Sequence, residues 1–194
     1  KETKERYDLY SSQKTDLEES IAGITKLIKE LEHNMKKEFV EKFGEISNNF
    51  KNVYKKLFGG GTGELTIADK ENILESDIII TAQPPGKKMK NINLLSGGEK
   101  ALTAICILFA IIISRPTPFC ILDEIEAPLD DINVYRFGEF LKELSQETQF
   151  IAVTHRRGTM EAAEYIYGVT MQERAISKII SLKLQEAEKF AGII

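Results

Sequence analysis

The chain has 194 residues, of which 42% are hydrophobic and 29% are charged, and its formal net charge is −4. This apolar content is sufficient for a globular core and excludes a wholly disordered chain. Because positive and negative charges nearly balance, no global basic field indicates nucleic-acid binding. The first residues carry no charged, apolar and small-residue pattern of a secretory signal, so we expect a cytoplasmic protein. The chain begins with Lys1 rather than Met, and we expect it to be part of a longer protein.

Residues 1–58 are predicted to form one long coiled-coil helix. Apolar side chains recur at alternating spacings of four and three, at Leu17, Ile21, Ile24, Ile28, Leu31 and Met35. This spacing is typical of a coiled-coil seam. Beyond Met35, two successive spacings of four shift the register, which unwinds a supercoil locally. A stripe this narrow needs a partner helix, which the rest of the chain does not obviously supply.

Two glycine-containing loops follow the helix. Neither FGGGTGEL (58–65) nor PPGKKM (84–89) has the residues and spacing of a nucleotide-binding P-loop. Clustered glycines after a helix are typical of a C-cap and turn. We therefore interpret both loops as structural.

The remaining segments alternate between strand and helix patterns, and residues 59–194 are predicted to form one α/β domain. Strands are predicted at 64–69, 76–83, 118–122, 149–153, 166–171 and 176–182. Helices are predicted at about 96–114, 131–145 and 158–164. Buried apolar strands joined by helices imply a mainly parallel sheet that is covered on both faces. Ligands gather at the carboxyl ends of the strands in such sheets.

The two cysteines and the most apolar helical segment are interpreted as core. Cys106 and Cys120 lie in apolar runs without a Cys or His at metal-binding spacing, which predicts buried thiols in a reducing compartment. The stretch 101–114 is too short and too interrupted to span a bilayer. We therefore expect no membrane association.

The helix in LLSGGEKALTA (94–104) begins with a motif that helix capping alone does not explain. Ser96 and Glu99 have the spacing of a capping box. Gly97 and Gly98 are each less favourable than Ala in a helix by roughly 1 kcal/mol. Glycines there leave backbone N–H groups accessible at the positive end of the helix dipole, which is a site for an anion. We predict that a phosphate docks at this turn.

Polar side chains end two of the apolar strands. Asp123 and Glu124 follow the strand at 118–122, and His155 follows the strand at 149–153. Adjacent carboxylates can hold a hard cation and orient a water. Alternatively, Asp123 or Glu124 caps the following helix, and His155 taken alone is an ordinary polar residue at a strand end. The three residues together favour a hydrolytic site.

The motifs LLSGGEKALTA, PFCILDEIEAPLDDINV and QFIAVTHRRGTMEAAEYIYGVTMQERAISKIISLKL occur in this order. Together they resemble the carboxyl-terminal half of the ATPase head of bacterial structural maintenance of chromosomes (SMC) proteins, a branch of the ABC-type ATPases. The resemblance runs from about Leu57 to Leu184 and includes LFGGG and AQPPGKK. It implies the carboxyl-terminal lobe of an ABC-type head, a mainly parallel sheet flanked by helices, joined to the coiled-coil helix at 1–58.

The resemblance implies a role for each matched residue. It places the signature motif at Ser96, Gly97, Gly98 and Glu99. Asp123 matches the Walker B aspartate that holds Mg²⁺, and Glu124 matches the catalytic glutamate that activates water. Asp130 matches the D-loop and His155 matches the switch histidine. In that family the signature helix closes on the γ-phosphate of ATP that the opposite head binds.

Three positions depart from the family pattern. Glu126 stands where Asp is more common, Thr62 where Lys or Arg is expected, and Gly63 where Ala is expected. The departure at Glu126 bears on the approach of the D-loop, and the other two bear on the turn only.

The resemblance also implies the partners. In SMC proteins the P-loop lies in the amino-terminal half of the head, so this chain needs that half and a second head, as a homodimer, to bind and hydrolyse ATP. A kleisin subunit and, through the full complex, DNA are further partners, and the implied location is the nucleoid. Alone, the chain is expected to be inactive.

Three other functions stay open from the sequence. The head of a coiled-coil ABC ATPase of DNA double-strand-break repair would share the signature and Walker B motifs. A catalytically silent coiled-coil scaffold would be free to lose the candidate residues, all of which are present. A DNA-binding module would depend on the basic residues Lys87, Lys88, Lys90, Arg156 and Arg157. So few charges give weak and salt-sensitive contacts.

Overall fold

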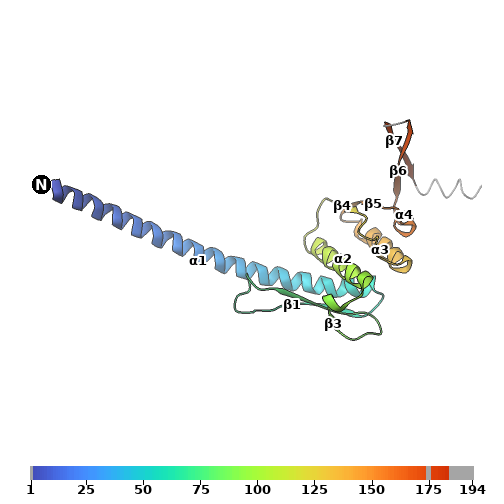
Figure 1. The fold of residues 1–194 in the computed structure, drawn as a ribbon, viewed down its shortest axis with the longest axis horizontal. Coiled ribbons are helices and arrows are strands. Elements are labelled where there is room, and N and C mark those ends of the chain that lie inside the picture. The colour runs from blue at the N-terminus through green and yellow to red at the C-terminus, as the bar shows by residue number, and fades with distance from the viewer. Residues whose placement is uncertain (1, 174–175, 184–194) are drawn as a thin grey trace, which may run out of the picture. The chain divides into compact units, whose positions relative to one another are not determined.

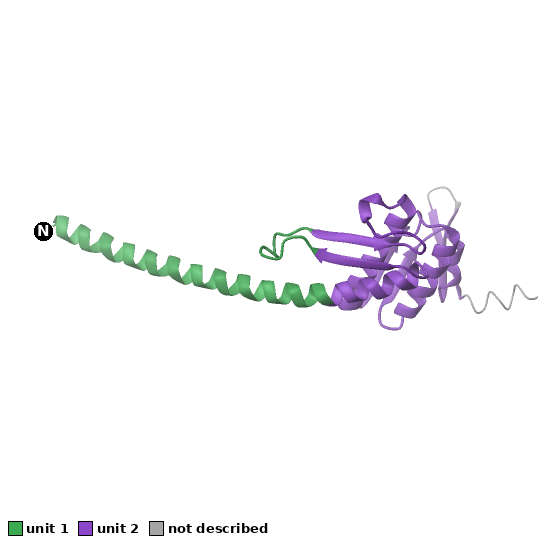
Figure 2. Ribbon diagram, turned by 90° about the horizontal axis from the view of Figure 1, so that it is seen from below, with its two compact units in different colours: residues 1–44, 67–77 green, residues 45–66, 78–194 purple. Residues whose placement is uncertain are grey.

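The computed structural model describes residues 2–173 and 176–183 and divides into two compact units. Residues 1–44 and 67–77 form unit 1, and residues 45–66 and 78–194 form unit 2 (Figure 2). The order of elements, shown in Figure 1, is α1 (Glu2–Leu57), β1 (Thr62–Ile67), β2 (Ile78–Gln83), β3 (Lys90–Asn91), η1 (Ile92–Leu94), α2 (Gly97–Ser114), β4 (Phe119–Asp123), α3 (Asp131–Leu144), β5 (Gln149–Val153), α4 (Arg157–Glu161), β6 (Tyr165–Glu173) and β7 (Ile176–Lys183). The division of the chain at residue 58 stays a prediction.

The long helix predicted from residues 1–58 is confirmed as α1. Within unit 1 its residues 2–38 are all exposed, including the predicted seam, whose members range from Ile28 at 50% to Leu17 at 64% exposed. Pairing of this seam in a coiled coil stays a prediction. The rest of unit 1 is the loop 67–77, which a backbone hydrogen bond of 2.9 Å from the Ala68 N–H to the Asp77 carbonyl closes.

The end of α1 forms one part of the core of unit 2. Phe50, Val53, Tyr54 and Leu57 are buried on one face of the helix, and the rings of Phe50 and Tyr54 make an edge contact with centroids 5.8 Å apart. Gly63 fits against this packing, because a Cβ there would lie 2.6 Å from the Phe50 ring. A large aromatic side chain thus occupies the space that Ala would need.

The glycine loop after α1 is structural, as predicted. Gly59, Gly60 and Gly61 all have positive φ angles, which residues other than glycine rarely adopt. A Cβ on Gly61 would also lie 2.2 Å from the Gln83 carbonyl oxygen. Only glycine therefore fits where the loop passes the end of β2.

Helices α2 and α3 form the other part of the core, around Phe109. Its ring centroid lies 5.8 Å from Phe137 and 5.3 Å from Phe140 on α3, and 6.3 Å from Phe150 on β5. By length and composition α2 as a whole could cross a membrane, which the sequence argument, limited to the stretch 101–114, did not anticipate. Its apolarity is accounted for in part by the side chains that it buries against α3.

The predicted mainly parallel sheet is wrong for the described residues. They form a three-stranded sheet in the order β1-β2-β3, a two-stranded sheet of β4 and β5, and a two-stranded sheet of β6 and β7. The pairs β2–β3 and β6–β7 are antiparallel, whereas β4 and β5 pair in parallel. The apolar strand patterns were correct, but an apolar pattern does not determine which strands become neighbours or in which direction they pair.

Strands β4 and β5 were predicted to be buried, and the structure covers them only in part. On one face Leu122 is buried and Phe150 contacts Phe109. On the other face the apolar side chains are exposed by about half, namely Phe119 56%, Ile121 60%, Ile151 47% and Val153 51%. This bare apolar face is typical of a surface that another polypeptide segment covers.

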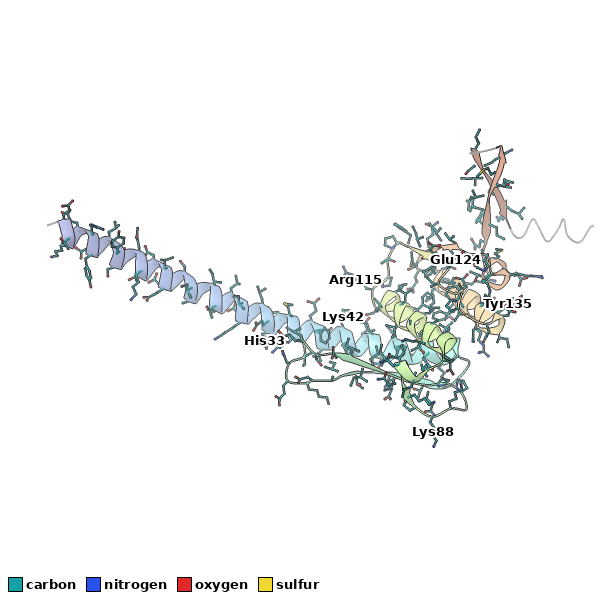
Figure 3. The ribbon with its side chains drawn as sticks, viewed as in Figure 1. His33, Lys42, Lys88, Arg115, Glu124 and Tyr135 are labelled. Atoms are coloured by element: carbon teal, nitrogen blue, oxygen red, sulfur yellow. The ribbon has the colours of Figure 1, made fainter. Side chains whose placement is uncertain are left out.

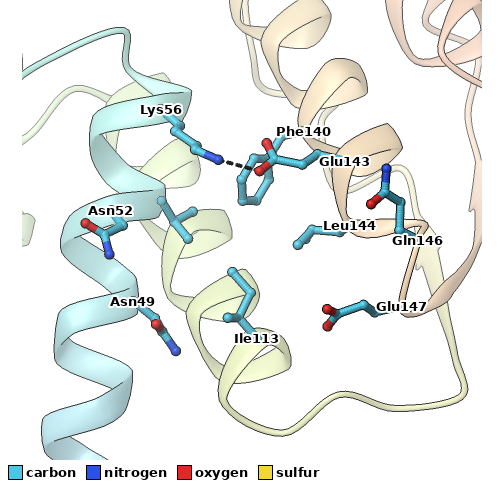
Figure 4. A pocket seen from close by; sticks show the side chains of 10 residues that line it. Asn49, Asn52, Lys56, Ile113, Phe140, Glu143, Leu144, Gln146 and Glu147 are labelled. Carbon is cyan, nitrogen blue, oxygen red and sulfur yellow. Dashed lines mark hydrogen bonds and ion pairs between the residues drawn. The ribbon is translucent and has the colours of Figure 1, made fainter.

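A cavity of about 340 Å³ lies where the end of α1 meets the ends of α2 and α3 (Figure 4). An ion pair between Lys56 and Glu143 crosses it, and Asn49, Ile113 and Phe140 are among its lining residues. None of the candidate site residues lines it. We therefore treat it as a feature of the helix packing.

Candidate functional site

The beginning of α2 has the predicted capping box. Ser96 is the N-cap in an extended conformation, and Glu99 Oε2 accepts hydrogen bonds from the Ser96 amide at 3.1 Å and from its hydroxyl at 2.8 Å. On its other oxygen Glu99 contacts Lys87 Nζ at 3.0 Å, within an ion pair. The loop that carries Lys87 thereby contacts the first turn of α2.

The Glu99 carboxylate is stabilised in its charged form. Partial burial acts to raise its pKa, but hydrogen bonds from Lys87 and Ser96 together outweigh burial, so the pKa lies below the ordinary value. Glu99 therefore stays ionised at neutral pH. Its negative charge also lies in the first turn of α2, where it is favourable to the helix dipole.

The two glycines at the start of α2, Gly97 and Gly98, differ in their surroundings. A Cβ on Gly97 would meet no atom within 4 Å, whereas one on Gly98 would lie 3.4 Å from the Pro128 carbonyl oxygen. No contact among the described residues therefore explains Gly97. Its position leaves the backbone at the helix start open to an external group, as the phosphate hypothesis requires.

The carboxyl ends of β4 and β5 bring Glu124 and His155 together. Because the strands pair in parallel, with Asp123 opposite Val153, the residues that follow them meet at one edge. Glu124 Oε1 lies 3.4 Å from His155 Nδ1, and the Glu124 amide donates to the Val153 carbonyl at 2.9 Å. Figure 3 shows Glu124 in the same region as the ends of these strands.

Glu124 has a left-handed backbone conformation, with φ of 48°. For a residue other than glycine this conformation costs roughly 1–2 kcal/mol. Strained residues cluster at functional sites, where the surrounding structure holds them. Here the turn directs the carboxylate toward His155 at the strand edge.

Asp123 ends β4 and is exposed. The described residues contain no group of three or more His, Cys, Asp or Glu side chains that could hold a metal ion alone. A single carboxylate is nevertheless compatible with Mg²⁺, which usually keeps its waters and binds one or two carboxylates together with substrate phosphates. The exposed Asp123 carboxylate thus fits a magnesium ion that binds together with a nucleotide.

Asp130 is the N-cap of α3. Its Oδ1 accepts a hydrogen bond from the Asn133 amide at 2.9 Å, and its Oδ2 accepts one from Asn133 Nδ2 at 3.0 Å. The alternative that Asp123 or Glu124 caps the following helix is therefore wrong. The capping carboxylate lies at the far end of the turn that begins at Glu124.

The sequence reasoning did not find the buried hydrogen-bonded group that Glu126 forms with two threonines. The side chain is 1% exposed, and its Oε1 accepts hydrogen bonds from the hydroxyls of Thr154 and Thr159, the latter at 2.9 Å. The only sequence signal was the departure of Glu126 from the family pattern. This buried group links the loop after β4 to the loop after β5.

The basic residues considered for DNA binding are partly used inside the chain. Arg156 contacts Asp131 at 2.8 Å, Arg157 contacts Glu161 at 2.6 Å, and Lys87 pairs with Glu99. Lys88 lies well away from Glu124 and the adjacent strand ends in Figure 3. The basic side chains therefore do not form one continuous patch.

The cysteines agree in part with the prediction. Both are free, and Cys106 is buried as expected, where burial raises the pKa of its thiol. Cys120 is only half-buried. It lies on β4, whose faces are incompletely covered within this chain.

Comparison with known proteins gives consistent matches along almost the entire chain. A model of the RecF/RecN/SMC N terminal domain matches residues 7–178. The chromosome partition protein Smc of Bacillus subtilis is 53% identical over 186 residues, which cover 96% of this chain and 16% of that protein. Smc of Desulfitobacterium hafniense is 51% identical over 185 residues, covering 95% of this chain and 15% of that protein. The chain thus spans less than a fifth of the length of these relatives.

Solved structures show the same similarity. An Smc head domain with an extended coiled coil from Pyrococcus furiosus, bound to the C-terminal domain of ScpA, superposes with a TM-score of 0.77 at 40% identity. That match covers 97% of this chain and 47% of the other. A structure from work on the ATP-driven dimerization and DNA-stimulated activation of SMC ATPases matches with a TM-score of 0.71 at 43% identity, covering 81% of this chain and 95% of the other.

Proposed function

We propose that this chain, which belongs to the RecF/RecN/SMC family, is the carboxyl-terminal half of the ATPase head of an SMC protein. The observation that carries the proposal is the pairing of Glu124 and His155 at 3.4 Å, at the carboxyl ends of two parallel strands. The strand order of a complete head would place a nucleotide at this edge. The chain itself lacks the P-loop that would cradle the phosphates.

The residues at the strand edge have distinct roles in hydrolysis. Glu124 orients the attacking water and accepts its proton, and His155 holds the Glu124 carboxylate in place and contacts the phosphate region. Asp123 is the carboxylate that would hold Mg²⁺. When bound, the ion neutralises charge that develops on the phosphate oxygens.

The signature turn acts on a different nucleotide from Glu124. Among the described residues, no hydrogen bond or ion pair links Ser96 or Glu99 to Glu124 or His155. The amides that follow Ser96, with Gly97 open toward solvent, receive the γ-phosphate of ATP bound by a second head. Hydrolysis then requires a homodimer of engaged heads, with Asp130 in the turn between them.

Two incomplete surfaces support the need for an amino-terminal half. The outer face of β4 and β5 exposes Ile121 and Ile151, which pair across the strands. The seam on α1 exposes its apolar residues in the same way. The amino-terminal half would cover the first surface with helices packed on that face of the sheet and the second with an antiparallel helix.

The complete protein would organise, condense and segregate chromosomes, in the cytoplasm and associated with the nucleoid. The relatives are named chromosome partition proteins, and the related head from Pyrococcus furiosus was solved with the C-terminal domain of ScpA. We accordingly propose a kleisin as a partner and DNA as a ligand of the full complex. The named relatives favour this function over that of a DNA-repair ATPase.

The proposal is tested by purifying the chain with and without the amino-terminal half of its head. We expect no ATP hydrolysis by the chain alone and measurable hydrolysis by the complete head. Glu124→Gln in the complete head should abolish turnover and trap ATP-bound dimers, observable by size-exclusion chromatography, because the shape stays while the base is lost. Robust turnover by the isolated chain, lost on Glu124→Gln, would contradict the proposal.

A further inference from the structure

Glu126 is the only charged side chain that is buried among the described residues. Removing a carboxyl group from water is costly unless hydrogen bonds replace its hydration. Two threonine hydroxyls, those of Thr154 and Thr159, supply such bonds to its Oε1. An apolar side chain of similar size would fill the same space without this cost. The carboxyl group therefore needs an explanation other than stability.

The two threonines lie on either side of His155. Thr154 directly precedes it, and Thr159 belongs to α4, which begins two residues after it. The Thr154 Oγ1 also accepts a hydrogen bond of 2.9 Å from the Arg156 amide, which closes a tight turn around His155. One oxygen of Glu126 thus fixes the loop that carries the histidine from both sides.

Glu126 also belongs to the turn that carries Glu124. The Ala127 amide donates to the Glu124 carbonyl at 3.0 Å, and the Leu129 amide donates to the Glu126 carbonyl at 3.0 Å. The Glu126 side chain therefore joins two loops, each of which carries one member of the Glu124–His155 pair.

Packing does not fix that pair itself. The His155 and Glu124 side chains are 66% and 54% exposed. Exposed side chains keep several rotamers, so their separation depends on where the two backbones hold them. In this arrangement the buried carboxyl group of Glu126 determines the spacing of the exposed Glu124 and His155 side chains.

We propose that Glu126 is a positioning residue for ATP hydrolysis, which holds the His155 loop against the Glu124 turn through Thr154 and Thr159. The inference rests on the proposed function, because it takes Glu124 and His155 as the reacting pair. Glu126 does not touch the nucleotide or the water in this role. It acts through His155, and a misplacement of about 1 Å at such a pair can lower the rate by on the order of a hundredfold.

The test uses steady-state ATP hydrolysis by the full-length homodimeric protein. We expect Glu126→Leu to lower kcat by at least about tenfold while KM for ATP changes little, because only the reacting geometry is lost. Glu126→Gln keeps an acceptor oxygen for both hydroxyls and should retain most of the rate. Equal losses for Leu and Gln, or a loss that appears only in KM, would overturn the proposal.

The same substitution in a His155→Ala background separates positioning from general destabilisation. If Glu126 acts through His155, Glu126→Leu causes no further loss of kcat in that background. A further loss by the same factor would overturn the proposal. Should the Leu variant fail to fold, Thr154→Val and Thr154→Ser replace it, with loss expected for Val and retention for Ser. Equal rates for these two variants would equally contradict the inference.

Thr148→Val is the matched control. Thr148 is a buried threonine, 3% exposed, and directly precedes β5, at the opposite end of that strand from Thr154. Its loss should leave kcat unchanged, and a tenfold fall would contradict the specific role of Glu126. Glu124→Gln, measured in parallel, tests the proposed function separately. If Glu124→Gln abolishes turnover while Glu126→Leu leaves kcat intact, only the positioning role fails.

Discussion

The two ends of α1 have the same kind of helical pattern and opposite environments. Near its carboxyl end Phe50 and Leu57 are at most 1% exposed, whereas Ile21 and Ile28 in unit 1 are at least 50% exposed. The apolar spacing alone does not distinguish these segments. What differs is whether other residues of this chain cover the side chains, so the comparison separates a surface that the chain buries from one that it leaves exposed.

Truncation at the complete end should have the largest effect on stability. We expect Phe50→Ala to lower the free energy of unfolding of the chain by about 3–5 kcal/mol, because it leaves a cavity beside Tyr54. Ile28→Ala should change it by less than about 1 kcal/mol in the chain alone. Urea unfolding followed by circular dichroism measures both. If both variants lost a similar free energy of unfolding, the two ends of α1 would not differ in how much of their apolar surface the chain buries.

The exposed apolar face of β4 and β5 should become buried when the amino-terminal half is added. Ile121→Ala is expected to have little effect in the chain alone and to cost about 2–4 kcal/mol in the complete head, where the side chain becomes buried. The measurement is the shift in the urea midpoint of each preparation. An effect that is the same in both would show that this face stays uncovered.

A third comparison uses glycines rather than apolar residues. Gly63→Ala should destabilise the chain by about 1–3 kcal/mol, because the new methyl group meets the Phe50 ring. Gly23→Ala, which meets nothing within 4 Å, should stabilise α1 by about 0.5–1 kcal/mol. Thermal unfolding reports the sign of each change. Stabilisation by both substitutions would contradict the packing described at Gly63.

The smallest expected effect concerns the ion pair between Lys87 and Glu99 at the start of α2. Because the pKa of Glu99 is lowered in the folded protein, its contribution to stability is present above the unfolded pKa of about 4.3 and is lost as the pH falls through the lower folded value. Lys87→Met should weaken this dependence and cost about 0.2–1 kcal/mol at pH 7. Unfolding measured between pH 7 and acid provides the comparison. An unchanged pH profile would contradict the assigned partners.

Local structure was largely predictable from the sequence, and its assembly was not. The spacing of apolar residues gave α1, α2 and α3, and β-branched clusters gave most strands within a few residues. The two-residue strand β3 and the short helix η1 were missed because they are too brief for periodicity to register. The predicted sheet, covered on both faces, was wrong because Phe119 and Ile121 have the apolar character of buried residues and yet are exposed in the structure.

For the candidate site, the sequence predicted the residues but not the contacts between them. Glu124 and His155 were chosen because each follows an apolar strand, and only the parallel pairing of β4 and β5 shows that they meet. Glu126 was missed because a lone Glu carries no sign of burial in its neighbours. Its partner Thr159 lies 33 residues away, a separation at which no periodic pattern operates.

Mixing two inactive variants tests the assignment of signature and catalytic residues most directly. In full-length protein, Ser96→Arg disables the signature turn and Glu124→Gln disables the base. If the turn acts on the nucleotide of the other head, a mixed dimer keeps one intact site, so combining the variants should restore ATP hydrolysis that neither shows alone. Pull-down of differently tagged subunits verifies that mixed dimers have formed. If such dimers show no recovery of ATP hydrolysis, Ser96 and Glu124 of the same subunit act on the same nucleotide, which would contradict the account.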